Sequence, residues 1–168
     1  MDKRYFFIII IIFIGCINLF LVASNSDVIG CASVNFDRYT FSLPSGVNVL
    51  NTYEKYVQLS DEHLNCYISV SVNDNPYNTF ESNLNKLNNS SEYKVLSKGI
   101  IDVGNIPVSS IYYQSSDSSK NISNKAMFFF EKDNTQFEIK LSSFSYSDRD
   151  KTIDVVSYIV ESLRLNYK

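Results

Sequence analysis

The chain has 168 residues, with 18 acidic and 15 basic side chains, a formal net charge of −3, one histidine and three cysteines. This mildly negative charge argues against nucleic acid or an anionic lipid surface as the partner. With one histidine and so few cysteines, a tetrahedral zinc site would need carboxylates to complete its ligands.

The first predicted element is an apolar segment, residues 5–23, which follows Lys3 and Arg4. As a helix it would be roughly 28 Å long, close to the roughly 30 Å hydrocarbon core of a bilayer. The basic residues before it predict a cytoplasmic N-terminus. We therefore expect residues 1–24 to be a signal peptide or a membrane anchor, with the following domain outside the cell membrane or secreted.

The sequence leaves open how this segment is processed. Residues 22–24 (Val-Ala-Ser) offer small side chains for cleavage by a signal peptidase. Cys16 and Cys31 each follow Ile-Gly and resemble the cysteine that is lipidated in bacterial lipoproteins. Cys16 lies inside the apolar run, however, and Cys31 lies far beyond it. Cleavage, lipidation and retention as an anchor are therefore all alternatives.

Residues 25–34 are expected to be a linker, and residues 35–168 a single domain. Several segments of this domain alternate apolar and polar residues, which is typical of half-buried strands. The predicted strands are residues 36–43, 53–59, 64–72, 93–103, 106–114, 125–131 and 135–142. In the third strand Leu64, Cys66, Ile68 and Val70 share the buried face. In the last strand we expect Phe137, Ile139 and Leu141 to be buried, and Glu138 and Lys140 to be exposed.

Two amphipathic helices are also predicted. The first covers residues 77–87, is capped near Asp74, and has an apolar stripe of Tyr77, Phe80, Leu84 and Leu87. The second closes the chain after a capping box at residues 147–150, with a stripe of Ile153, Val156, Ile159 or Val160, and Leu163. About six or seven antiparallel strands with two helices predict an α+β domain.

Three segments carry a family resemblance. They are residues 39–46 (Tyr-Thr-Phe-Ser-Leu-Pro-Ser-Gly), the strand at residues 137–141 and the helix around residues 159–163. Their order resembles the PsbP-like family, named for an extrinsic subunit of photosystem II, over about residues 35–165. The resemblance implies an antiparallel sheet sandwiched by helices and an accessory or binding role without chemistry. It brings no set of functional residues.

His63 and Cys66 are the nearby pair that suggests a thiol nucleophile and its base. Side chains three positions apart on a strand point to opposite faces, so we expect the two to diverge. Cys66 is then a buried core thiol, or it forms a disulfide with Cys31, which an oxidising compartment permits. Asp61, Glu62 and His63 are interpreted as a solvated turn in preference to a cation site. Asp74 lacks the glycine and distal glutamate of a calcium loop.

Two other features bear on surface and core. Asn88, Asn89 and Asn121 each begin an Asn-x-Ser triplet and are candidate glycosylation sites. Residues 128–130 (Phe-Phe-Phe) indicate a strand buried on both faces.

These features predict a non-enzymatic extracytoplasmic binding or accessory domain without a cofactor. Its partner would be a protein or a cell-envelope component, anchored at the interface by exposed aromatic residues such as Tyr53 and Tyr67. A surface solute-binding or adhesive module is the alternative, and a cell-surface hydrolase is less favoured.

Overall fold

The computed structural model describes residues 32–116 and 121–166. The predicted signal peptide or anchor, Cys16 and Cys31 lie outside these residues. Among the described residues, no helix combines the length and the apolar character needed to cross a membrane. The contacts group Ser33–Lys168 into one compact unit.

Within the described residues, the chain forms ten strands in two antiparallel sheets and two α-helices. The strands are β1 (Ser33–Phe36), β2 (Tyr39–Ser42), β3 (Val47–Thr52), β4 (Tyr56–Asp61), β5 (Cys66–Val72), β6 (Tyr93–Val103), β7 (Ile106–Ser116), β8 (Ile122–Lys132), β9 (Thr135–Phe144) and β10 (Arg164–Leu165). The helices are α2 (Phe80–Asn88) and α3 (Arg149–Ser162), the latter preceded by a 3₁₀ turn at Tyr146–Asp148.

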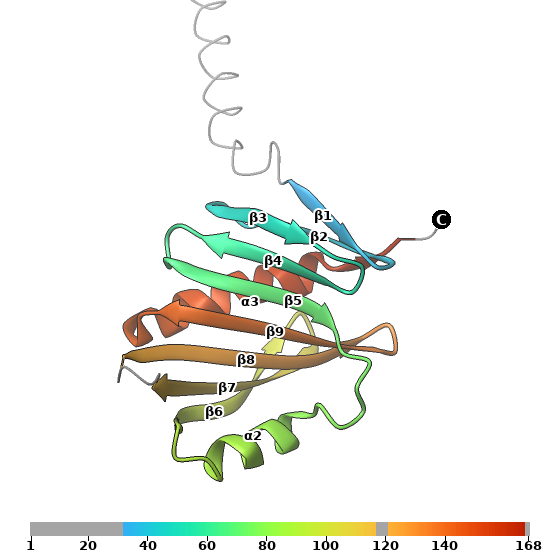
Figure 1. Cartoon of the computed structure of the whole chain (residues 1–168). Helices are drawn as coiled ribbons and strands as arrows, with labels where there is room; N and C mark the ends of the chain where they lie inside the picture. Colours follow the sequence, from blue (N-terminus) through green and yellow to red (C-terminus); the bar gives the residue numbers. More distant parts are fainter. Residues whose placement is uncertain (1–31, 117–120, 167–168) are drawn as a thin grey trace, which may run out of the picture. The chain divides into compact units, whose positions relative to one another are not determined.

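The large sheet has seven described strands in the order β3-β4-β5-β9-β8-β7-β6, and β1, β2 and β10 form a smaller sheet. Figure 1 shows α3 crossing behind the large sheet and α2 beside its β6 end. Phe128 and Phe130 belong to the cluster that contains Val156 of α3, whereas Phe129 belongs to the cluster of Leu87 of α2. Because neighbouring strand residues point to opposite faces, the two helices cover opposite faces. The predicted α+β class and the doubly buried strand are confirmed.

The first third of the domain differs from the prediction. The predicted strand at residues 53–59 begins only at Tyr56. Residues 36–43 do not form one strand, because the chain turns at Asp37, whose φ of 49° is left-handed, and separates β1 from β2. β1 begins at Ser33, inside the predicted linker. β3 was not predicted, because five of its six residues are exposed and no run of buried apolar positions marks this strand in the sequence.

The first helix begins later than predicted. The N-cap of α2 is Thr79, whose hydroxyl accepts from the Ser82 amide at 3.2 Å, while the Ser82 hydroxyl accepts from the Thr79 amide at 3.0 Å. This reciprocal pair satisfies two amides at the helix start, so Asp74 is not the cap. Tyr77 lies before the helix and is 84% exposed, so it is not part of the apolar stripe.

The closing helix keeps its predicted buried stripe except at Ile153, which is half-buried. Val156, Ile159, Val160 and Leu163 are all buried. The predicted capping box is wrong, since Asp148 at the N-cap accepts from Lys151 Nζ at 2.8 Å instead of from a helix amide.

The central strands have the predicted polarity except at one residue. Cys66, Ile68 and Val70 are buried, and Ile68 and Val70 pair with Leu141 and Ile139 of β9. Glu138 was expected to be exposed, but it is 3% exposed. The segment that leads into α2 covers it, and Asn78 Nδ2 donates to Glu138 Oε2 at 3.2 Å.

Candidate functional site

The structure separates the predicted pair His63 and Cys66. His63 is exposed in the turn between β4 and β5, and Cys66 is 3% exposed in the core. Burial, with a smaller effect from the charge of Asp61, raises the pKa of the Cys66 thiol to about 12. The reactive species of cysteine is the thiolate, so this thiol is poorly suited to nucleophilic chemistry. Because Cys31 lies outside the described residues, its disulfide with Cys66 stays a prediction.

The acidic residues of this turn are engaged within the fold. Asp61 is buried, and its Oδ1 accepts from the amides of His63 at 2.8 Å and Leu64 at 3.0 Å. Glu62 Oε1 accepts from Asn48 Nδ2 at 2.9 Å. In the described part of the chain, no three His, Cys, Asp or Glu residues are grouped so that they could hold a metal ion.

The three candidate glycosylation sites all lie at the surface. Asn88 is the last residue of α2, Asn89 is its C-cap, and Asn121 directly precedes β8. All three side chains are exposed. Their positions are compatible with glycan attachment, which stays a prediction.

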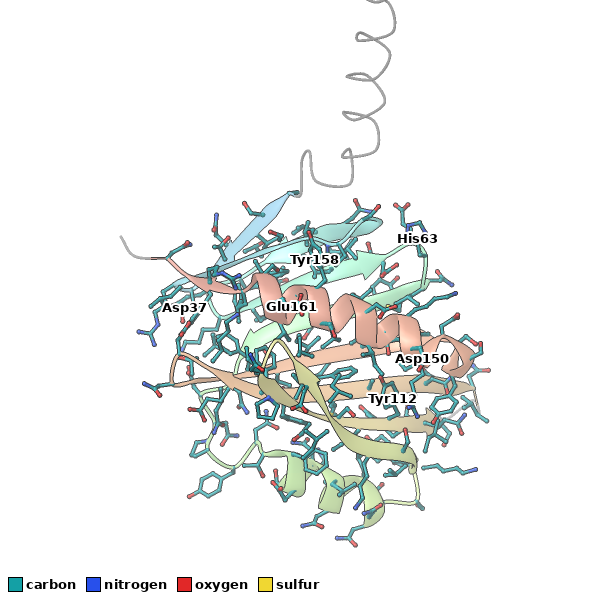
Figure 2. All side chains as sticks on the ribbon, turned by 180° about the vertical axis from the view of Figure 1, so that it is seen from behind. Asp37, His63, Tyr112, Asp150, Tyr158 and Glu161 are labelled. Carbon is teal, nitrogen blue, oxygen red and sulfur yellow. The ribbon has the colours of Figure 1, made fainter. Side chains whose placement is uncertain are left out.

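A cleft of about 650 Å³ lies where four chain segments meet at one end of the domain. The segments are the β1–β2 turn, the β3–β4 turn, the segment after β5 and the β8–β9 turn with the start of β9. Figure 2 shows Asp37 of this end and His63 on opposite sides of the domain. We call this the charged cleft, and it is lined by Asp37, Arg38, Lys55, Val72, Asn73, Asp74, Pro76, Glu131, Asn134, Thr135 and Gln136.

Both signs of charge occur in the charged cleft. Lys55 Nζ pairs with Asp74 Oδ2, and the hydrogen bond and charge of Asp74 raise the pKa of the Lys55 ammonium. The Arg38 guanidinium lies 5.6 Å from the centre of the Tyr39 ring. The Tyr39 hydroxyl is 2.5 Å from Thr135 Oγ1, which ties β2 of the small sheet to β9 of the large one.

A second cavity of about 320 Å³ lies between the start of α2 and strands β7, β8 and β9. We call it the apolar pocket, because its walls include Phe80, Pro107, Phe129, Phe130 and Phe137. It shares three lining residues with the charged cleft, namely Asn73, Glu131 and Gln136. The two cavities are therefore adjacent, and together we call them the groove.

A network of asparagines holds the wall of the groove. The Asn73 amide donates to the Gln136 carbonyl at 2.8 Å, and Asn73 Nδ2 donates to the Asn78 carbonyl at 2.6 Å. Asn83 Nδ2 of α2 donates to Asn78 Oδ1 at 2.7 Å. Asn78 in turn donates to the buried Glu138 of β9. These bonds fix the segment before α2 onto the sheet, so the groove is formed before any ligand arrives.

On the face that carries α2, the part of the sheet beyond this helix is a second surface of interest, which we call the open face. A hollow of about 310 Å³ lies there, next to Tyr67, Lys125 and Lys140. Tyr67 is 59% exposed, as predicted. Tyr53 is also exposed and stacks on Tyr56, with ring centres 4.3 Å apart. Neither Tyr53 nor Tyr67 lines the groove.

The groove has the side chains of a binding site more than those of a catalytic one. Two of its hydroxyls are already engaged, since Thr135 contacts Tyr39 and Thr79 caps α2. Its carboxylates, amides and cations offer hydrogen bonds and charge pairs to a ligand. Its residues come from turns that are far apart in the sequence and form no motif, so sequence reasoning missed it.

Comparison with known proteins gives likenesses in fold. No protein-family model matches the sequence, and no curated protein matches it. A solved protein from Bacteroides thetaiotaomicron has a TM-score of 0.52 at 10% identity, over 78% of this chain. The alignment covers 46% of that protein, so the chain spans about half of its length.

The Ran-binding protein Mog1p of Saccharomyces cerevisiae has a TM-score of 0.50 at 9% identity, over 76% of this chain and 90% of that one. The chain shares the fold of Mog1p. A cyanobacterial PsbP from Synechocystis is also a structural neighbour, with a TM-score of 0.47 at 13% identity, over 77% of this chain and 83% of that one. The TM-score of this last likeness is too low to assign the chain to the PsbP-like family.

Proposed function

We propose that the domain is a non-enzymatic binding module, and that the groove receives an extended segment of a protein partner. The observation that carries the proposal is the adjacency of the charged cleft and the apolar pocket. A polypeptide segment offers what both parts need, because it combines charged side chains, backbone amides and apolar side chains in one chain.

The two cavities suit different parts of such a segment. The apolar pocket is large enough for an apolar side chain, which would lie against Phe80 and Phe129. The charged cleft contains both Arg38 and Glu131, so it can pair with residues of either sign. Interface energy is usually concentrated in a few anchors of this kind within a larger contact.

A protein partner also agrees with the fold comparison. Mog1p is described as a Ran-binding protein, so a protein of this fold can bind another protein. The likeness is one of fold alone, and we do not propose that this chain binds the same partner.

The place of action that we propose is outside the cytoplasm. Lys3 and Arg4 before the apolar residues 5–23 support export of the domain, with residues 1–24 as a signal peptide or anchor. In this proposal the domain is an accessory module similar to the PsbP-like family, which the order of its elements resembles.

A second candidate function is solute binding. The volume of the charged cleft, about 650 Å³, falls within the roughly 300–1,000 Å³ common for small-molecule sites. A small charged solute would use Arg38, Lys55 and Glu131 without the apolar pocket.

Affinity capture from an envelope extract of the source organism tests the proposal. We expect the Arg38→Glu variant to retain at least tenfold less partner than the wild-type protein. Tyr67→Ala, a change outside the groove, should retain the wild-type amount. Equal capture by Arg38→Glu, with loss in Tyr67→Ala, would place the site on the open face of the sheet. A solute that raises the melting temperature, without any captured protein, would favour the second candidate.

A further inference from the structure

The outer edge of β6 is open at its centre. β6 ends the order of the seven-stranded sheet and has no strand neighbour on its outer side among the described residues. Lys98, Gly99 and Ile100 are exposed in succession, and Ile100 is 68% exposed. Because glycine has no side chain, the exposure of Gly99 is exposure of the backbone itself. An open edge of this kind can pair with another strand.

The turn after β6 determines which backbone groups point outward. Gly104 and Asn105 have φ values of 55° and 70°, as in the two-residue turn that is closed by a hydrogen-bonded pair, here Val103 and Ile106. Hydrogen-bonded pairs alternate along an antiparallel ladder, so Ile101 and Gly99 also bond to β7. The hydroxyl of Ser110 donates to the Gly99 carbonyl at 3.3 Å, in agreement with this assignment.

The backbone groups of Lys98, Ile100 and Asp102 therefore point away from the sheet. Their side chains lie on one face, because they are two residues apart. The outward row thus carries a cation, an exposed apolar side chain and an anion, equally spaced about Ile100.

We propose that two copies of this chain pair antiparallel through their β6 edges, with a two-fold axis at Ile100. In this register Ile100 lies opposite Ile100 of the second copy, and the exposed isoleucine contacts its equivalent. Lys98 lies opposite Asp102 of the second copy, and the same pair forms again on the other side of the axis. Opposite charges in facing positions stabilise a strand pair.

The charge pattern selects this register over its neighbours. Sliding one strand by two residues keeps the backbone bonds, but it places Ile100 opposite Lys98 or Asp102 and leaves the charges unmatched. The β6 residues that pack against α2 are not part of the paired stretch. Tyr93 and Val95, the β6 residues that pack in the α2 cluster, lie on the far side of the bulge between Val95 and Ser97. The paired stretch, residues 97–103, lies on the near side of this bulge.

Cysteine cross-linking of the full-length chain in membranes tests the contact. The chain would carry Cys16→Ser and Cys31→Ser, and Cys66 is buried. Facing residues of a hydrogen-bonded pair are about 5.5 Å apart at Cα, which a disulfide can bridge. We expect oxidised Ile100→Cys to migrate at twice the mass of the chain. Ile122→Cys, a control that is also 68% exposed, should stay at the mass of one chain.

Charge reversal tests the register. In sedimentation of the full-length chain in detergent, we expect a dimer for the wild type, a monomer for Lys98→Asp and for Asp102→Lys, and a dimer again for the double reversal. Thermal unfolding of each variant checks that the fold is unchanged. The proposal is overturned if Ile100→Cys cross-links no better than Ile122→Cys or only to another protein. A double reversal that stays monomeric would overturn it too.

Discussion

The imidazole ring of His63 lies directly against Gly46. A Cβ atom on residue 46 would be 2.3 Å from His63 Cδ2 and 2.5 Å from Nε2. Gly46 also has a φ of +79°, and its carbonyl accepts from the Glu62 amide at 3.0 Å. The histidine therefore packs two turns together, and this contact accounts for its position without a role as a catalytic base.

Replacing Gly46 tests this packing. Gly46→Ala combines a steric clash with a left-handed backbone, and we expect it to lower the free energy of unfolding by roughly 1–3 kcal/mol. Adding His63→Ala should recover the steric part and leave the backbone strain. Urea denaturation of the two single variants and the double variant measures both parts. A double variant no more stable than Gly46→Ala would show that the ring is not the obstacle. His63→Ala alone should keep full partner capture.

Glu138 leads to a second stability prediction. Its Oε2 lies 2.8 Å from Lys140 Nζ, while its buried Oε1 has no hydrogen-bond partner in the described structure. Removing the cation in Lys140→Ala leaves a buried carboxylate poorly compensated, so we expect a loss of about 1–3 kcal/mol. Lys94→Ala, an exposed control, should change stability by less than about 0.5 kcal/mol.

This prediction assumes that the negative charge of Glu138 is what makes the loss of the Lys140 cation destabilising. Glu138→Gln removes the charge and keeps the shape, so adding Lys140→Ala to it should cost little more. Chemical denaturation of the four proteins completes the cycle. Full additivity of the two changes would mean that the ion pair does not carry the effect.

The Cys66 thiol should be protected in the folded protein. With Cys16→Ser and Cys31→Ser in place, we expect a bulky thiol reagent at pH 8 to label the unfolded chain at least a hundredfold faster than the native one. Mass spectrometry of the labelled peptides measures the ratio. Rapid labelling of native Cys66 would contradict its burial.

The raised pKa of Cys66 also predicts a dependence on pH. Folding raises this pKa from 9.0 to about 12, so the folded state favours the neutral thiol. Its contribution to stability is complete below pH 9 and is lost as the pH rises toward 12. Tyr113, with its pKa raised to about 12 by burial, adds to the same trend. Melting temperatures should fall over this range, and less steeply in Cys66→Val. An equally steep fall in that variant would assign the trend to other groups.

Export of the domain is tested by a reporter. A phosphatase fused after Lys168 should be active, because we expect the basic residues before the apolar segment to keep the N-terminus in the cytoplasm. The same fusion without residues 1–24 is the control and should be inactive. High activity of a cytoplasmic reporter at the same position would contradict export.

The strands could be predicted where one face of the strand is buried and the other is exposed to solvent. Cys66, Ile68 and Val70 alternate with polar residues, and their burial follows from that pattern alone. β3 could not be found in this way, because Val49 and Leu50 are exposed and nothing in the sequence marks an edge strand. Glu138 sits where alternation predicts exposure, and only the packing of the segment before α2 buries it.

The groove depends on contacts that no local pattern encodes. Arg38, Lys55, Asp74 and Gln136 lie in turns, where charged and amide residues normally indicate solvent. Asp74 and Gln136 meet because β5 and β9 pair in the sheet, although more than sixty residues separate these strands. Lys55 joins them because β4 pairs with β5, and Arg38 joins them because its neighbour Tyr39 contacts Thr135. The polar turns could be predicted, but their convergence follows from the order of the strands.

Site-specific photo-cross-linking in living cells tests the central claim most directly. A photoreactive phenylalanine analogue would replace Gln136, which lines both parts of the groove, or Tyr67 on the open face of the sheet as the matched control. The account predicts a defined protein adduct from position 136 and none from position 67. An adduct from position 67 alone would contradict a protein-binding groove at this end of the domain.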